Sequence, residues 1–372
     1  DKLGLTHTAA LDNAPPVLAF TTVALGGFRG LISNLLWIRA TELQEEDKFF
    51  EMVQLADWIT KLEPHFTQVW LQQAWNMAYN ISVKFKDFSD RWNWVRRGIC
   101  LLRDEGLKYS PNDLLIHREL GWFFQHKMGH NLDDANNYYK RAWYDEMSAF
   151  FKSKNADFDE LIHPVTEEAK ARAKALREEY KLDPLVMKET DERYGPLDWR
   201  LPEAHAIYWA VTGLKQVKAD PDRVDKENTM TLHRLIYQSL HQAVMHGRVD
   251  YAPLVGKLDL SPQLDLLQKT SDAYEQALAE EPPQNHDGIR RAHRNLIKNA
   301  VFYLYTYDRI QEAARWYKYL GKTYPNDSVI SGDPTRTALT TSLDEYAIAR
   351  VEENSTDPNS QYDTRLIVEG LL

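Results

Sequence analysis

The spacing of apolar residues predicts helices along most of the chain. From residue 34 to 325, apolar positions recur every three or four residues, which is the period of a helix with one buried face. Alternating apolar and polar runs, which would indicate strands, are scarce. Prolines fall where helices should begin or end, as at Pro64, Pro111, Pro164, Pro202 and Pro325. The pattern therefore predicts an all-α fold of antiparallel helical hairpins.

Three segments share one arrangement, a helix followed by a short polar turn and a second helix. They cover residues 36–64, 113–143 and 292–325. In each, small residues let the two helices approach, and aromatic residues fill the groove toward the next hairpin. The residues that carry the pattern are Ala56 and Pro64 in the first segment, Leu120, Gly121, Phe124, Ala135, Tyr139 and Ala142 in the second, and Ala313, Tyr317 and Pro325 in the last.

These residues resemble the tetratricopeptide repeat family, which places a Leu-Gly pair and aromatics on its first helix. Its second helix carries Ala, an aromatic residue, a second Ala and a closing Pro. The resemblance covers about half of the chain and is clearest at residues 113–143. It implies hairpins stacked in a right-handed superhelix, with irregular insertions where the pattern is absent.

Composition shifts divide the chain into five regions. They are an apolar N-terminal segment (1–33), repeat-like hairpins (34–150), a charged helix with an irregular insertion (151–200), a second set of hairpins (201–325) and an acidic C-terminal tail (326–372). The tail carries nine acidic and three basic residues, so its net charge is −6.

Residues 16–38 form the most apolar stretch and are about long enough to span a bilayer. Arg29 and the Gly26–Gly27 pair interrupt it, so we expect an apolar approach over 17–25 and then an amphipathic helix. That helix, with Phe28, Leu31, Ile32, Leu35 and Leu36 on one face, is either the first helix of the core or a membrane-proximal segment whose anchor lies before Asp1.

Charge and cysteine content exclude several classes of protein. The chain has 372 residues, 43% apolar, and a formal net charge of −10. Global disorder is inconsistent with that apolar content, and a nucleic-acid binder usually carries a basic face that this balance does not supply. A single cysteine, Cys100, excludes an internal disulfide framework and a Cys-based zinc site.

Catalytic and metal motifs do not emerge from the sequence. His126 and His130 lie four residues apart, but Gly129 should break the helix between them, and no His-Glu-x-x-His motif occurs. Adjacent acidic residues fall where turns and exposed helix ends are expected. The sequence therefore predicts no catalytic residue, metal or cofactor. The alternative is an enzyme on an α/α scaffold, with a cleft near His117, His126 and Asp133.

Tryptophan is concentrated in the first 150 residues, which hold eight of the eleven. These side chains either fill the space between hairpins or line a groove for a hydrophobic partner. Around residues 72–80, amides alternate with aromatics, and in repeat arrays of the resembled family Asn side chains often clamp a peptide backbone. The predicted partner-binding residues are Gln72, Trp75, Asn76, Tyr79, Asn80, Arg96 and Arg97.

The sequence thus favours a non-catalytic helical-repeat scaffold that binds a protein or peptide partner. No nucleic-acid partner is expected. The apolar N-terminal segment favours membrane association and a place in the cell envelope over free cytoplasm. Besides the enzyme, the other alternative is a permanent structural subunit of a membrane complex, and no particular oligomeric state is predicted.

Overall fold

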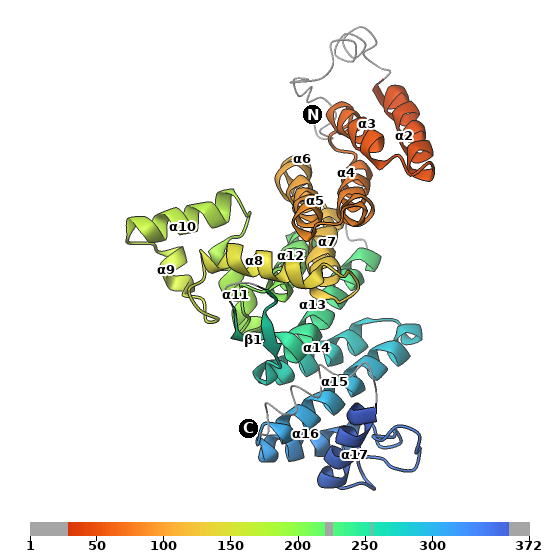
Figure 1. Cartoon of the computed structure of the whole chain (residues 1–372), viewed down its shortest axis with the longest axis vertical. Helices are drawn as coiled ribbons and strands as arrows, with labels where there is room; N and C mark the ends of the chain where they lie inside the picture. The colour runs from red at the N-terminus through yellow and green to blue at the C-terminus, as the bar shows by residue number, and fades with distance from the viewer. Residues whose placement is uncertain (1–28, 220–225, 254–255, 357–372) are drawn as a thin grey trace.

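The computed structural model describes residues 29–219, 226–253 and 256–356, and it is all-α apart from one small sheet (Figure 1). The helices of the first half are α2 (Arg29–Glu45), α3 (Phe49–Leu62), α4 (Thr67–Trp75), α5 (Phe88–Cys100), α6 (Leu107–Tyr109), α7 (Leu114–Trp122) and α8 (Asn136–Ser148). Those that follow are α9 (Phe158–Ile162), α10 (Glu167–Glu178), α11 (Pro184–Tyr194), α12 (Pro202–Ala219), α13 (Lys226–His246), α14 (Leu267–Glu280), α15 (His286–Thr306), α16 (Ile310–Thr323) and α17 (Leu343–Thr356).

Three of these helices continue without a break into π-helical turns. The segment η2 (Asn76–Ile81) extends α4, η4 (Leu101–Gly106) extends α5, and η5 (Phe123–Gly129) extends α7. Short 3₁₀ turns lie at η3 (Ser82–Lys84), η7 (Leu264–Leu266) and η8 (Pro283–Asn285). A π turn adds a residue to the helical turn and so rotates the side chains that follow it.

Helices α4 and α7 run parallel although their equivalent positions lie 46 or 47 residues apart in sequence. At their N-terminal ends, Thr67 Oγ1 donates to Asp113 Oδ2, and at their C-terminal ends Tyr79 Oη lies 3.1 Å from His126 Nδ1. Both contacts join residues 46 or 47 apart in sequence. Equivalent helices of successive hairpins therefore lie side by side, as in a repeat array.

The parallel arrangement continues toward the C-terminus, and on the N-terminal side one side-chain contact joins the preceding helix to this pair. Arg118 Nη1 donates to Asn228 Oδ1 at 2.8 Å, and Gln125 Nε2 donates to Ser239 Oγ at 3.2 Å, so α13 runs parallel to α7. Toward the N-terminus, Gln72 Nε2 donates to Gln44 Oε1 at 2.7 Å, which places α2 beside α4. We call α2, α4 with η2, α7 with η5, and α13 the A row.

The intervening helices pack antiparallel to the A row. Gln73 of α4 donates to the Val53 carbonyl of α3, and Asn76 of η2 donates to the Phe49 carbonyl. Because the later donor meets the earlier acceptor, α3 and α4 run antiparallel. Farther along, α12 packs heavily on α7 and α13. A Cβ on Gly121 would lie 3.2 Å from the Ala206 carbonyl oxygen, which shows how closely α7 approaches α12. The predicted antiparallel hairpins are therefore present.

The molecule is an elongated stack with α2 and α3 at one end and α16 and α17 at the other (Figure 1). One continuous core extends from Trp70 to Tyr346, and a smaller cluster lies beneath α2 and α3. Helices α9 and α10 project to one side, where Arg172 pairs with Glu160 at 2.7 Å and bonds the Phe150 carbonyl. The charged helix expected in region 151–200 is α10.

Two features of the described part were not foreseen, a small sheet and a helix in the tail. Strands β1 (Arg248–Tyr251) and β2 (Asp259–Ser261) form an antiparallel pair after α13. In the acidic tail, α17 packs through the fully buried Tyr346, whose hydroxyl donates to the Lys298 carbonyl at 2.7 Å. The tail expected from 326 onward thus includes a docked helix up to Thr356.

The apolar face expected for the first helix is not buried as its role as a first core helix would require. Leu31 and Leu35 are 55% and 60% exposed, whereas Ala40 and Leu43 are buried against α3. The reason is that α2 packs on α3 chiefly through its C-terminal half. The extended approach expected over 17–25 lies outside the described residues. Within those that are described, no helix has both the length and the apolar composition needed to cross a membrane.

Candidate functional site

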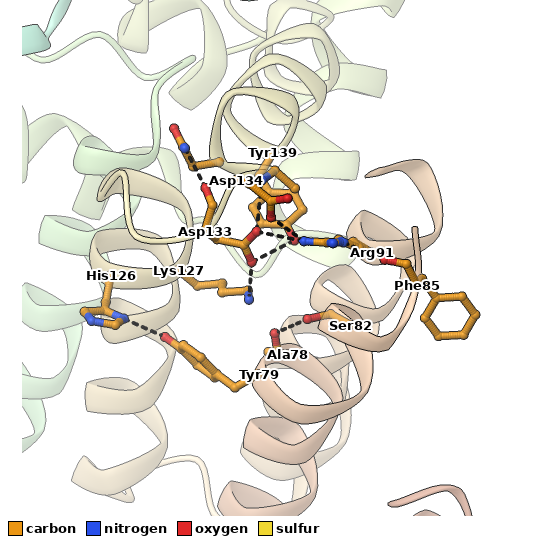
Figure 2. A network of polar contacts seen from close by, with 12 residues as sticks. Ala78, Tyr79, Ser82, Phe85, Arg91, His126, Lys127, Asp133, Asp134 and Tyr139 are labelled. Carbon is orange, nitrogen blue, oxygen red and sulfur yellow. Dashed lines mark hydrogen bonds and ion pairs between the residues drawn. The ribbon is translucent and has the colours of Figure 1, made fainter. Parts of the chain in front are cut away.

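A cavity of about 480 Å³ opens between the second and third hairpins, at the C-terminal ends of two A-row helices. Charged and polar side chains line most of it, with two apolar ones at the rim. The lining residues are Tyr79, Val83, Arg91, His126, Lys127, Leu132, Asp133 and Asp134. Figure 2 shows η2 and η5 contributing Tyr79, His126 and Lys127, while Arg91 reaches in from α5.

Asp133 is the centre of the charged part of this site. Its carboxylate accepts hydrogen bonds from Lys127 Nζ at 2.5 Å, Arg91 Nη1 at 3.3 Å and Tyr139 Oη at 3.1 Å (Figure 2). It also accepts from the backbone N–H of Ala135, so the same side chain forms the turn that leads into α8. Arg91 makes a second bond, to Asp134.

For Asp133 and Lys127, burial and the ion pair shift the pKa in opposite directions. Burial alone would raise the pKa of Asp133, but the bonds from Lys127 and Ala135 outweigh it and hold the pKa below its ordinary value. Burial lowers the pKa of Lys127, and its bond to Asp133 partly offsets that. The carboxylate is therefore ionised at neutral pH and pairs with the ammonium group. Two cations and two carboxylates make this part of the site close to neutral.

The aromatic part consists of two stacked pairs, one on each A-row helix. Trp75 stacks on Tyr79 with ring centres 4.1 Å apart, and Trp122 stacks on His126 at 4.4 Å. In each pair the partners are four residues apart, which places both rings on one side of a helix. The bond between Tyr79 Oη and His126 Nδ1 joins the pairs. Trp75 remains 37% exposed, whereas Tyr79, Trp122 and His126 are partly buried.

The imidazole of His126 and the hydroxyl group of Tyr79 are uncharged near neutral pH. Burial, with the nearby His130 and Lys127, lowers the pKa of His126. Burial and the charge of Glu119 raise the pKa of Tyr79. A neutral imidazole and a phenol each offer a donor and an acceptor, which suits hydrogen bonding to backbone amides.

Glu119 lies on α7 one turn before Trp122. Its side chain is only 8% exposed, and burial raises its pKa to about 7. The oxygen Oε1 is fully buried and accepts no hydrogen bond from the described residues.

The structure brings two of the seven predicted partner-binding residues into the aromatic pairs, namely Trp75 and Tyr79. Gln72 lies one turn earlier on the A row, where it binds Gln44. Arg96 and Arg97 lie on α5, away from these pairs. Arg96 pairs with Glu146 at 3.0 Å, and the Arg97 guanidinium lies over the Trp94 ring at 4.7 Å.

The two asparagines have a role inside the fold. Asn76 is fully buried, and its amide donates to the Phe49 carbonyl at 3.3 Å. Asn80 donates in turn to Asn76 Oδ1 at 3.2 Å. Although Asn76 follows Trp75 directly, the helix turns its side chain toward α3. A peptide-clamping role for Asn76 would require breaking this packing.

Of the three residues of the alternative enzyme cleft, two lie in one cavity and the third lies elsewhere. His126 and Asp133 line the same cavity, as that alternative requires. His117 does not, because it is buried against Trp209 and its Nδ1 lies 2.8 Å from the Asp113 carbonyl oxygen of its own helix. The described residues hold no group of three or more His, Cys, Asp or Glu side chains placed to bind a metal ion.

The predicted partner-binding set leaves out several residues of the site, among them Arg91, Lys127, Trp122 and Glu119. Trp122 and His126 repeat the four-residue spacing of Trp75 and Tyr79 one hairpin later, and this repeat was the sequence signal that could have identified them.

Comparisons with models of known protein families, with curated protein sequences and with solved structures find no match to this chain.

Proposed function

We propose that this chain is a non-catalytic helical-repeat scaffold of the tetratricopeptide type, wound as a right-handed superhelix, which binds an extended segment of a partner protein. One observation carries the proposal: parallel neighbouring helices present matching, partly exposed aromatic pairs, Trp75–Tyr79 and Trp122–His126. Aromatic side chains that are rigid before binding lose little conformational entropy when a partner covers them.

The arrangement of the pairs suits a chain that crosses the helices. Equivalent residues of α4 and α7 are 46 or 47 positions apart, so the pairs repeat in space from one hairpin to the next. Tyr79 and His126 supply uncharged hydrogen-bonding groups beside the rings. An extended segment would stack apolar side chains on the tryptophans and bond its backbone to the polar tips.

The test is photo-crosslinking in cells that naturally contain the protein. Benzoylphenylalanine replaces Trp75 in one variant and Leu185 in a second, which serves as control. Leu185 is also an exposed apolar residue, at 51%, but it lies on α11 outside the site. Mass spectrometry then identifies the crosslinked peptide.

The proposal predicts one partner sequence crosslinked from position 75 and absent from position 185. A synthetic peptide of that sequence should bind the wild-type chain, and Trp75→Ala with Trp122→Ala should weaken binding at least tenfold, which corresponds to about 1.4 kcal/mol. Identical crosslinks from both positions, or equal affinity of the double variant, would refute it.

Association of the N-terminal end with a membrane is a second proposal, favoured by α2. Leu31, Leu35 and Ile38 are each more than half exposed and follow directly on the apolar residues 16–28. An outward apolar face of this kind is typical of a helix that lies against lipid or another apolar surface. In a flotation assay with phosphatidylglycerol-containing vesicles, replacing all three by Ser should release the protein. Unchanged flotation would count against this role.

A further inference from the structure

A separate cavity, of about 580 Å³, lies among α14, α15 and the C-terminal end of α16. Leu278 of α14 lines one side and the N-terminal half of α15 lines another. Residues 323–327, which end α16 and form the turn after it, line the third. This cavity shares no lining residue with the one beside the aromatic pairs, so the two sites are distinct.

Three arginine side chains of α15 line this cavity. Arg290 and Arg291 precede Arg294 by four and three residues, and this spacing places all three on one side of the helix. Counting Lys and Arg against Asp and Glu, α15 carries four basic residues and one acidic residue, whereas the whole chain has a net charge of −10. Positive charge is therefore concentrated at this cavity against the balance of the chain.

Two of the three arginines are not used by the fold. Arg290 and Arg291 are exposed, and their side chains form no hydrogen bond or ion pair with any other residue that the structure describes. Arg294 pairs with Asp327 at 3.0 Å, which holds its guanidinium at the wall of the cavity. Asp287 is the other carboxylate of the lining. Three guanidinium groups against two carboxylates leave an excess of positive charge.

The positive potential extends one turn farther along α15. Burial, together with the charges of Arg350 and Arg294, lowers the pKa of Lys298 to about 8, although Glu353 and Asp327 act in the opposite direction. A lysine loses its proton more readily where other cations lie close to it. The surroundings of the cavity therefore favour a negatively charged ligand.

The chemistry of the arginines selects among anions. A guanidinium presents pairs of N–H groups in a planar fork that matches two oxygens of a phosphate or a carboxylate. A phosphate monoester carries a charge of about −2 near neutral pH and three terminal oxygens, so it can bond several guanidinium groups at once. A carboxylate has one charge and two oxygens, and it leaves part of this set unpaired.

We propose that Arg290, Arg291 and Arg294 bind the phosphate group of a phosphorylated ligand in this cavity. Asp327 holds Arg294 in place before the ligand arrives, and the two exposed arginines close on the phosphate oxygens. The site is independent of the proposed scaffold function, because it lies on a different hairpin and uses none of the aromatic pairs.

The test is isothermal titration calorimetry of the whole chain at low ionic strength, because salt screens exposed charges. The probe is N-acetyl-O-phospho-L-serine amide, and N-acetyl-L-glutamate amide is the carboxylate control. One variant combines Arg290→Gln with Arg291→Gln, which have no described side-chain partner and should leave the fold intact. The matched control combines Arg315→Gln with Lys318→Gln, two exposed residues of α16 outside the cavity, and removes the same charge.

The phosphoserine amide should bind saturably at one site and at least tenfold more tightly than the glutamate amide. The Arg290 and Arg291 double variant should lose at least tenfold in affinity, whereas the α16 control should change it less than twofold. Equal affinity for the two amides, equal losses in the two double variants, or no saturable binding would overturn the site.

Inorganic phosphate, titrated in the same way, distinguishes the two sources of such a group. Tighter binding of the phosphoserine amide supports the site and indicates a phosphorylated side chain as the ligand. Tighter binding of inorganic phosphate, lost in the same double variant, supports the site and indicates a free phosphate.

Discussion

At the scale of single residues, neighbours in sequence have opposite roles in the A row. Trp75 is exposed, whereas Asn76 is fully buried and bonded to the Phe49 carbonyl. The sequence predicted an amide-and-aromatic cluster, but it could not say which amides face outward, because that depends on where α3 packs. Asn76 therefore links two hairpins.

Replacement of Asn76 by Ala should lower the free energy of unfolding by about 1–3 kcal/mol, because a buried carbonyl loses its donor and a cavity remains. Asn80→Ala is the control, since it removes only a partly buried bond and should cost less. Urea unfolding of both variants measures the difference. Equal stability of Asn76→Ala and wild type would contradict the structural role.

Glu119 should make the protein less stable as the pH rises from about 4.5 to 7. Its pKa is about 7 in the folded chain against 4.5 for an ordinary glutamate, so the folded state binds more protons in this window. Glu119→Gln should be more stable than wild type at pH 8, by up to about 3 kcal/mol. At pH 4 the two should be nearly equal. A difference that does not change with pH would exclude ionisation as its cause.

At the scale of elements, helix type and most boundaries followed from the sequence because apolar spacing is a local signal. The short polar turn expected within residues 36–64 is present at Asp47, which has the left-handed conformation between α2 and α3. The hairpin expected after Pro202 is α12 and α13. The π turns and the pairing of α7 with α13 were not predictable, because each depends on contacts between residues far apart in sequence.

Because α4 and α5 approach closely, replacing Gly98 by a larger residue should destabilise the protein. A Cβ on Gly98 of α5 would lie 2.9 Å from the Ala74 carbonyl oxygen of α4, whereas one on Gly288 of α15 meets nothing within 4 Å. Gly98→Ala should therefore lower the melting temperature and cost about 1–3 kcal/mol. Gly288→Ala should be neutral or stabilise by up to about 1 kcal/mol. Thermal unfolding of the pair compares the two directly, and equal effects would contradict the packing.

At the scale of the whole molecule, the stack is held together partly by buried neutral histidines. His293 is an example: its two ring nitrogens lie 2.8 Å from Ser271 Oγ and 2.9 Å from Tyr324 Oη, which joins α14, α15 and the end of α16. Such residues read as polar in the sequence, so their place in the core could not be predicted from apolar spacing alone.

Acid should unfold the protein over a defined range. Burial lowers the pKa of His205, His241, His246 and His293 to about 4 each, against 6.5 for an ordinary histidine. The unfolded chain binds more protons between these values, so stability falls as the pH drops from 6.5 toward 4, by about 2–3 kcal/mol for each group. Circular dichroism across this range should show a steep loss of helix. Full stability at pH 4.5 would contradict the neutral, buried state.

The most direct test of the central claim, that the A row binds a partner segment through its aromatic pairs, is hydrogen–deuterium exchange of the chain with and without the crosslinked peptide. The account predicts slower exchange in η2 and η5, at Asn76–Ile81 and Phe123–Gly129. It predicts unchanged exchange in α10, which projects to one side of the stack. Protection confined to α9–α11, or to the C-terminal hairpins, would contradict it.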